Sequence, residues 1–154
     1  MSLRKHTQDW EELADMDPCW AILSCPSGRF GGWDVDEFFL TGVREIEGVM
    51  EHAVRLGYPA LRESALDFGC GIGRLTRPLA KYFQQCYGVD ISQRMIAEAK
   101  ELNGSLSKSE FLVNSEEHLR VFSDGYFDMI YTNIVLQHIP KKSMIKSYIS
   151  EFVR

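Results

Sequence analysis

The sequence predicts an α/β fold: a parallel sheet of about four strands in the order 3-2-1-4, with helices on both faces. From residue 64 onward, short apolar segments typical of strands alternate with segments of helical periodicity. The first strand ends in a run of glycines that leads into the next helical segment. A chain of 154 residues, 45% of them hydrophobic, can form one domain with a buried core. Because crossovers between parallel strands are right-handed, these alternating elements build one parallel sheet.

The elements after residue 63 are expected in regular alternation. The strands span residues 65–68, 86–89, 111–113 and 127–132. The helices span residues 74–83, 93–102, 116–120 and 141–153, and Ser92 is the expected N-cap of the second. The last helix is expected to bury one face, formed by Ile145, Tyr148, Ile149, Phe152 and Val153.

Residues 1–62 are expected to form an N-terminal helical extension, and residues 63–154 the sheet domain. A long amphipathic helix should run from a capping box at Asp34 and Glu37 to Gly57. Before it, a shorter helix is expected near residues 10–13, and Asp17-Pro18 should halt it or start a new turn. The glycine-rich residues 27–32 should form a loop.

The composition favours a small-molecule partner over several other classes of function. The net charge of -5 gives no basic footprint for nucleic acid. The four cysteines form no CxxC pair and have no histidine at zinc-finger spacing, so no metal site is expected and the thiols should be reduced. No apolar stretch approaches the length of a membrane span. We therefore expect a cytoplasmic protein that binds a small molecule.

The glycine turn carries the first chemical signal. Residues Asp67 to Gly73 read Asp-Phe-Gly-Cys-Gly-Ile-Gly, and glycines there let a ligand approach the backbone closely. The spacing is GxGxG followed by Arg74, whereas dinucleotide sites favour GxGxxG. Asp90 ends the second strand 21 residues after Gly69, near the distance at which an acid binds a ribose. NAD and S-adenosylmethionine both satisfy this pair of features.

Three segments together resemble the successive motifs of class I S-adenosylmethionine-dependent methyltransferases, which have a Rossmann-like fold. They are Leu66-Asp-Phe-Gly-Cys-Gly-Ile-Gly-Arg74, Gly88-Val-Asp-Ile-Ser92, and Asp128-Met-Ile-Tyr-Thr132 followed by Val135-Leu-Gln-His-Ile139. The resemblance covers residues 64–140 and follows the family's motif order, which makes it more specific than a single glycine motif.

The resemblance implies a role for each site residue, with S-adenosylmethionine as cofactor and S-adenosylhomocysteine as product. The methionine end of the cofactor would lie near Asp67, Gly69, Gly71, Gly73, Thr132 and Asn133. The ribose and adenine would lie near Asp90, Ile91, Met95, Asn114 and Ser115, with Asn114 where many relatives have Asp. His138 would lie nearer the acceptor and could take up a proton near neutral pH. The N-terminal region would form a lid over the site with Trp33, Phe38, Phe39, Thr41 and Gly42.

The function that the sequence favours is methyl transfer to an unidentified acceptor. Two alternatives stay open: a noncatalytic module that binds S-adenosylmethionine, and an NAD-dependent oxidoreductase. Methyltransferases of this class usually have seven strands, and this sequence ends after the fourth helix. We therefore expect a C-terminally truncated chain with an incomplete acceptor half, and an exposed sheet edge at residues 127–132 that could support self-association.

Overall fold

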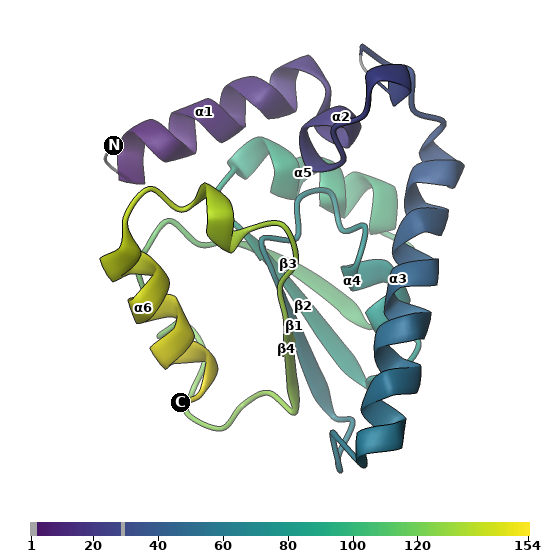
Figure 1. Cartoon of the computed structure of the whole chain (residues 1–154), viewed down its shortest axis with the longest axis vertical. Coiled ribbons are helices and arrows are strands. Elements are labelled where there is room, and N and C mark those ends of the chain that lie inside the picture. The colour runs from purple at the N-terminus through teal and green to yellow at the C-terminus, as the bar shows by residue number, and fades with distance from the viewer. Residues whose placement is uncertain (1–2, 29) are drawn as a thin grey trace.

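The computed structural model describes residues 3–28 and 30–154, and within them it contains one four-stranded sheet (Figure 1). Neighbouring strands are all parallel and follow the order β3-β2-β1-β4, which confirms the predicted fold class and strand order. The strands are β1 Ser64–Phe68, β2 Gln85–Asp90, β3 Ser109–Val113 and β4 Met129–Tyr131. Because the strands are parallel, their carboxyl ends meet at one edge of the sheet, where a ligand site is expected.

Helices α3 (Val35–Leu56), α4 (Thr76–Leu79) and α5 (Gln93–Asn103) cover one face of the sheet (Figure 1). Side chains alternate between the two faces of a strand, and Ala65, Cys86 and Phe111 point to this face. Two buried clusters form there, made of Ile46, Met50, Ala65, Leu75, Leu79, Ala80, Phe83 and Cys86, and of Cys70, Ile96, Ala99 and Phe111. These helices therefore pack against the side of the glycine turn that faces the core.

The opposite face is covered by α6 (Lys142–Phe152) and by the connection from β3 to β4. Its buried residues are Leu66, Phe68, Val89, Leu119, Phe122 and Tyr148. The aromatic rings of Tyr87, Phe122, Tyr126 and Phe127 lie in mutual contact, with centroids 4.7–5.8 Å apart. Helices therefore lie on both faces, as predicted.

Helix α3 begins and ends as the sequence predicts. The Asp34 side chain accepts the Glu37 N–H at 3.0 Å, and Gly57 ends the helix with a left-handed φ of 77°. Gly42 has a different reason: a Cβ there would lie 2.1 Å from the Arg74 carbonyl oxygen, so the glycine allows close packing. Although α3 has 22 residues, no helix in the described part of the chain is long and apolar enough to cross a membrane.

The aromatic pair at the start of α3 lies in the core and forms no lid surface. Phe38 is 0% exposed and Phe39 is 3% exposed, and their rings contact each other. The Arg77 guanidinium lies 3.4 Å from the centroid of the Phe39 ring, a cation–π contact that fixes α3 on the sheet domain.

Two predicted helices differ in the structure. The helix at residues 74–83 is reduced to α4, Thr76–Leu79. Pro78 has no N–H to donate to the Arg74 carbonyl at its start, and after Leu79 the N–H groups of Lys81 and Tyr82 donate three residues back. Residues 116–120 form no helix at all. There the Tyr148 hydroxyl donates to the Glu116 carbonyl at 2.6 Å, and the Leu119 N–H donates to Glu151 at 2.7 Å. Side chains of α6 thus replace the hydrogen bonds of a local helix.

The last strand and helix also differ in detail. The strand predicted at residues 127–132 is shorter, Met129–Tyr131. Before it, the Asp128 side chain accepts the N–H groups of Glu63 and Ser64, and after it the Thr132 hydroxyl donates to the Phe68 carbonyl. The predicted face of the last helix is wrong in part. Met144 and Tyr148 are buried, whereas Ile149 and Val153 are exposed.

The N-terminal region contains α1 (Leu3–Met16), α2 (Pro18–Ile22) and the short 3-10 helix η1 (Pro26–Gly28). Helix α1 is longer than the predicted 10–13 segment and ends before Asp17, which caps α2. Glu11 on α1 accepts the N–H groups of Gln93 at 2.6 Å and Arg94 at 3.2 Å, the first residues of α5. This contact holds α1 across the top of the sheet (Figure 1). Arg29, in the predicted loop, lies outside the described residues.

Candidate functional site

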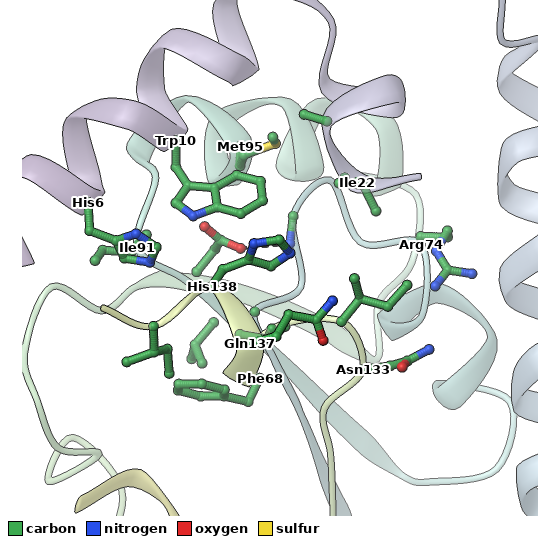
Figure 2. Close-up of a pocket in the computed structure, with 18 of the residues that line it drawn as sticks. His6, Trp10, Ile22, Phe68, Arg74, Ile91, Met95, Asn133, Gln137 and His138 are labelled. Carbon is green, nitrogen blue, oxygen red and sulfur yellow. Dashed lines mark hydrogen bonds between the residues drawn. The ribbon is translucent and has the colours of Figure 1, made fainter. Parts of the chain in front are cut away.

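A cavity of about 630 Å³ lies at the carboxyl ends of the strands. Its walls come from the glycine turn, the end of β2, the segment after β4, and α1 and α2 of the N-terminal region (Figure 2). This volume is in the range of small-molecule sites. The predicted site residues that line it are Gly69, Gly71, Asp90, Ile91, Met95, Asn114, Asn133 and His138.

The three glycines of the turn have separate tasks. All adopt left-handed backbone angles, with φ of 77° at Gly69, 52° at Gly71 and 87° at Gly73. Gly69 and Gly71 line the cavity, where side chains would block a ligand from the backbone. A Cβ on Gly73 would instead come within 2.9 Å of Asn103 and Phe111. Gly73 therefore allows α5 and β3 to pack closely and lies away from the cavity.

Asp90 closes the turn from the end of β2. Its Oδ2 accepts the Gly71 N–H at 2.9 Å, and its Oδ1 accepts the Ser92 N–H at 2.9 Å. Burial raises the pKa of Asp90, while the backbone hydrogen bonds to Ser92 and Gly71 act against that shift. Each carboxylate oxygen keeps a further lone pair, so the group can also accept hydrogen bonds from two neighbouring ligand hydroxyls.

Asp67 lies one layer below the cavity. It is 2% exposed, and its Oδ2 accepts the Thr76 hydroxyl at 2.7 Å. Burial raises the pKa of Asp67 to about 7, although the Thr76 hydrogen bond and the Arg74 charge oppose the shift. Asp67 is not among the residues that line the cavity, so any effect on a ligand passes through the turn above it.

The remaining predicted residues also divide into those that line the cavity and those that do not. Ile91, Met95 and Asn114 line the cavity, and Asn114 is fixed by its N–H, which donates to the Asp90 carbonyl at 2.8 Å. The Thr132 hydroxyl is turned inward and donates to the Phe68 carbonyl at 3.0 Å. Ser115, like Thr132, is not part of the cavity wall.

A polar network behind the turn was not predicted. Glu45 on α3 accepts hydrogen bonds from Arg74 at 2.9 Å, Tyr131 at 2.9 Å and Asn133 at 2.6 Å. Arg74 is 3% exposed, and with Asn133 it belongs to the cavity wall. The Arg74 guanidinium also donates to Thr41 at 3.3 Å. Glu45 shows no signal in the sequence, because it lies on a helix 29 residues before the arginine that it binds.

Two aromatic residues of α1 were also missed. His6 and Trp10 line the cavity and meet His138, which lies on the 3-10 helix η2 (Leu136–His138) after β4 (Figure 2). The ring centroids of Trp10 and His138 are 5.5 Å apart in an edge-to-face arrangement. Of the predicted lid residues, Trp33 lines the cavity, and its indole N–H donates to the Leu23 carbonyl at 3.1 Å.

Known proteins share this fold and these motifs. A family model described as a methyltransferase domain matches residues 66–154. A probable chloroplastic tocopherol O-methyltransferase from Oryza sativa subsp. japonica is 37% identical over 97 residues, which cover 60% of this chain and 25% of that protein. A ubiquinone biosynthesis O-methyltransferase from Xanthomonas oryzae pv. oryzae is 29% identical over 133 residues, which cover 77% of this chain and 55% of that protein.

Solved structures agree. A phosphoethanolamine N-methyltransferase from Haemonchus contortus, in complex with phosphoethanolamine and S-adenosylhomocysteine, covers all of this chain with a TM-score of 0.73 at 16% identity, a likeness of fold alone. This chain covers 31% of that protein. An S-adenosylmethionine-dependent methyltransferase from Clostridium acetobutylicum aligns with a TM-score of 0.59 at 25% identity, covering 68% of this chain and 42% of that one.

The match to the family model is the decisive comparison. It includes the glycine turn, Asp90 and the segment after β4 that ends in His138. The chain spans a quarter of the length of the rice relative and about half of the Xanthomonas relative. The matched region is more than half of this chain, and it contains the motifs on which the resemblance rests. The chain therefore belongs to the methyltransferase domain family.

Proposed function

We propose that this chain binds S-adenosylmethionine in the cavity and transfers its methyl group to an acceptor. One observation carries the proposal: Asp90 lies in the cavity wall, its two oxygens fixed by Gly71 and Ser92, with lone pairs left for a ligand. A carboxylate held in this way is suited to a ribose, whose two neighbouring hydroxyls can each donate to one oxygen.

The residues present fit the cofactor. Gly69 and Gly71 leave backbone exposed in the cavity wall, where an amino-acid group can approach. Ile91 and Met95 provide apolar surface beside Asp90 for a base or sugar, and Asn114 provides an amide that can hydrogen-bond to adenine. The cofactor contacts would thus follow the carboxyl ends of three neighbouring strands, β1, β2 and β3.

Four predicted residues take supporting roles in this proposal. Gly73 lets α5 pack closely, and Asp67 holds Thr76 beneath the turn. Thr132 fixes the segment after β4 to the end of β1, which places Asn133 in the cavity wall. Ser115 continues the chain beyond Asn114.

Methyl transfer from this cofactor needs few catalytic groups from the protein. The sulfonium of the bound cofactor supplies an activated methyl group, so the chain mainly has to align an acceptor and exclude water. Several of the curated relatives, among them the rice and Xanthomonas proteins, are named O-methyltransferases. We therefore propose a hydroxyl oxygen as the acceptor atom.

A cytoplasmic location fits this proposal, since all four cysteines are free thiols. Self-association through the outer edge of β4 also stays a proposal.

Calorimetry with S-adenosylhomocysteine tests the proposal. We expect binding to the wild-type chain and none with NADH. Asp90→Ala should weaken binding about tenfold or more, because it removes at least one hydrogen bond to a charged group, about 1.5–3 kcal/mol. Asp36→Asn, at an exposed position on α3, is the control and should bind as the wild type does. Unchanged affinity in Asp90→Ala would show that the ribose assignment is wrong, and no binding to the wild type would end the proposal.

A further inference from the structure

Three rings stand in a row on one side of the cavity. His6 and Trp10 come from α1, and their ring centroids are 6.4 Å apart at an interplanar angle of 89°. Trp10 and His138 are 5.5 Å apart at 85°. The indole therefore contacts both imidazoles in edge-to-face arrangements, and all three side chains line the cavity (Figure 2). The contact joins residues at opposite ends of the sequence.

His6 is buried without a hydrogen bond. Its side chain belongs to a residue that is 9% exposed, and within residues 3–28 and 30–154 no group donates to or accepts from its ring nitrogens. The His6 ring nitrogens are not among the fully buried atoms without a partner, so they are accessible from the cavity. The ring lies in the wall of the cavity, so a ligand can supply the missing hydrogen bond.

The charge state of His6 suits a group that accepts a hydrogen bond. Burial lowers the pKa of His6, the nearby charge of Asp9 raises it, and His138 lowers it. The lowered pKa leaves the imidazole neutral near pH 7, with one ring nitrogen available as an acceptor. The backbone of His138 is fixed by its N–H, which donates to the Val135 carbonyl at 2.9 Å, while its ring points toward Trp10 (Figure 2).

Much of the cavity wall is apolar, although Arg74, Asp90, Asn114, Asn133 and Gln137 add polar groups to it. Beside the three rings, the cavity wall contains Leu3, Phe68, Ile139, Met144 and Tyr148. The Tyr148 hydroxyl donates to the Glu116 carbonyl at 2.6 Å, so it is already engaged. A ligand with a flat apolar body could therefore rest against Trp10 and direct a single polar group to the imidazoles.

We propose that His6, Trp10 and His138 form the acceptor subsite, and that the acceptor is a phenol whose ring packs on Trp10 and whose hydroxyl hydrogen-bonds to an imidazole. The inference rests on the proposed function and adds His6 and Trp10 to it. In the transfer, the bond between the methyl carbon and sulfur breaks as the bond to the phenol oxygen forms, and sulfur keeps the electron pair. The phenol proton passes to an imidazole nitrogen and then to water.

Binding of 4-nitrophenol in the presence of saturating S-adenosylhomocysteine tests the subsite, because its absorbance reports whether the bound phenol has lost its proton. The wild-type chain should bind the probe and hold more of it as nitrophenolate than the double histidine variant does at the same pH. Trp10→Ala should weaken probe binding about tenfold, and Trp10→Phe should keep most of it, because a ring remains. The double variant His6→Gln/His138→Gln should still bind the probe but hold it in the protonated form.

The control is His52→Gln, at an exposed histidine on α3 outside this cavity. It should match the wild type in affinity and in spectrum. Each variant is first checked for S-adenosylhomocysteine binding, which separates the two ideas: no binding to the wild type refutes the proposed function. Intact S-adenosylhomocysteine binding with no nitrophenol binding, or a nitrophenolate spectrum unchanged in the double histidine variant, overturns the acceptor subsite alone.

Discussion

The buried carboxyl of Asp67 predicts an unusual dependence of stability on pH. Its pKa is raised from 3.8 to about 7, mainly by burial. Between these pH values the unfolded chain releases this proton while the folded chain keeps it. The carboxyl therefore makes the free energy of unfolding fall as pH rises from about 4 to about 7, and above that range the contribution is constant.

The size of the effect follows from the shift. A difference of about three pKa units, at about 1.4 kcal/mol each, corresponds to about 4 kcal/mol. Asp67→Asn removes the ionisation but keeps an oxygen that can accept the Thr76 hydroxyl. Relative to the wild type, the variant should be of similar stability near pH 4 and more stable by up to about 4 kcal/mol at pH 8.

Urea unfolding of the cofactor-free chain at several pH values between 4 and 8.5 measures the difference directly. Other titrating groups cancel when wild type and variant are compared at the same pH. Asp36→Asn, at an exposed site in the first turn of α3, should differ from the wild type by less than about 1 kcal/mol across this range. A constant difference for Asp67→Asn, or a wild type that gains relative stability at high pH, would refute the reasoning.

Four further substitutions, one of them a control, test the packing that positions the site. Gly42→Ala should destabilise the chain by about 1–3 kcal/mol, because the added Cβ would overlap a carbonyl oxygen. Gly48→Ala, on the same helix, has open space around it and should stabilise the chain by about 0.5–1 kcal/mol. Urea unfolding measures both variants, and equal effects would contradict the close approach at Gly42. Tyr148→Phe removes the hydrogen bond to Glu116 and should lower the stability measured by thermal unfolding by about 1 kcal/mol. If the variant is as stable as the wild type, this hydrogen bond does not stabilise the fold. Glu11→Ala should raise amide hydrogen exchange in residues 3–16, and unchanged protection there would show that α1 is held by other contacts.

The elements predicted correctly from sequence are those whose signals are local. The glycine turn, the strand that precedes it and the Ser92 cap of α5 all depend on residues within a few positions of one another. The strand order followed from the alternation of strands and helices, since crossovers have one hand.

The incorrect predictions share a different cause. Residues 116–120 have a helical pattern, but hydrogen bonds from α6 side chains more than 30 residues away replace the helix. In the candidate site, Glu45 and the pair His6 and Trp10 were missed because their partners are distant in sequence. A single sequence shows how residues are spaced along the chain, but it does not show which residues far apart in the chain come into contact.

The contact between Glu11 and the start of α5 connects the proposed cofactor site with the proposed acceptor subsite, so the two ligands can affect each other without touching. Ile91 lies in the junction between β2 and α5 and Met95 in the first turn of α5; we propose both as cofactor contacts, while α1 contains His6 and Trp10. A ligand that holds the junction in place also favours the docked position of α1, and a ligand that holds α1 favours the ordered junction. Cofactor and acceptor would then raise each other's affinity by the same factor, as thermodynamic linkage requires.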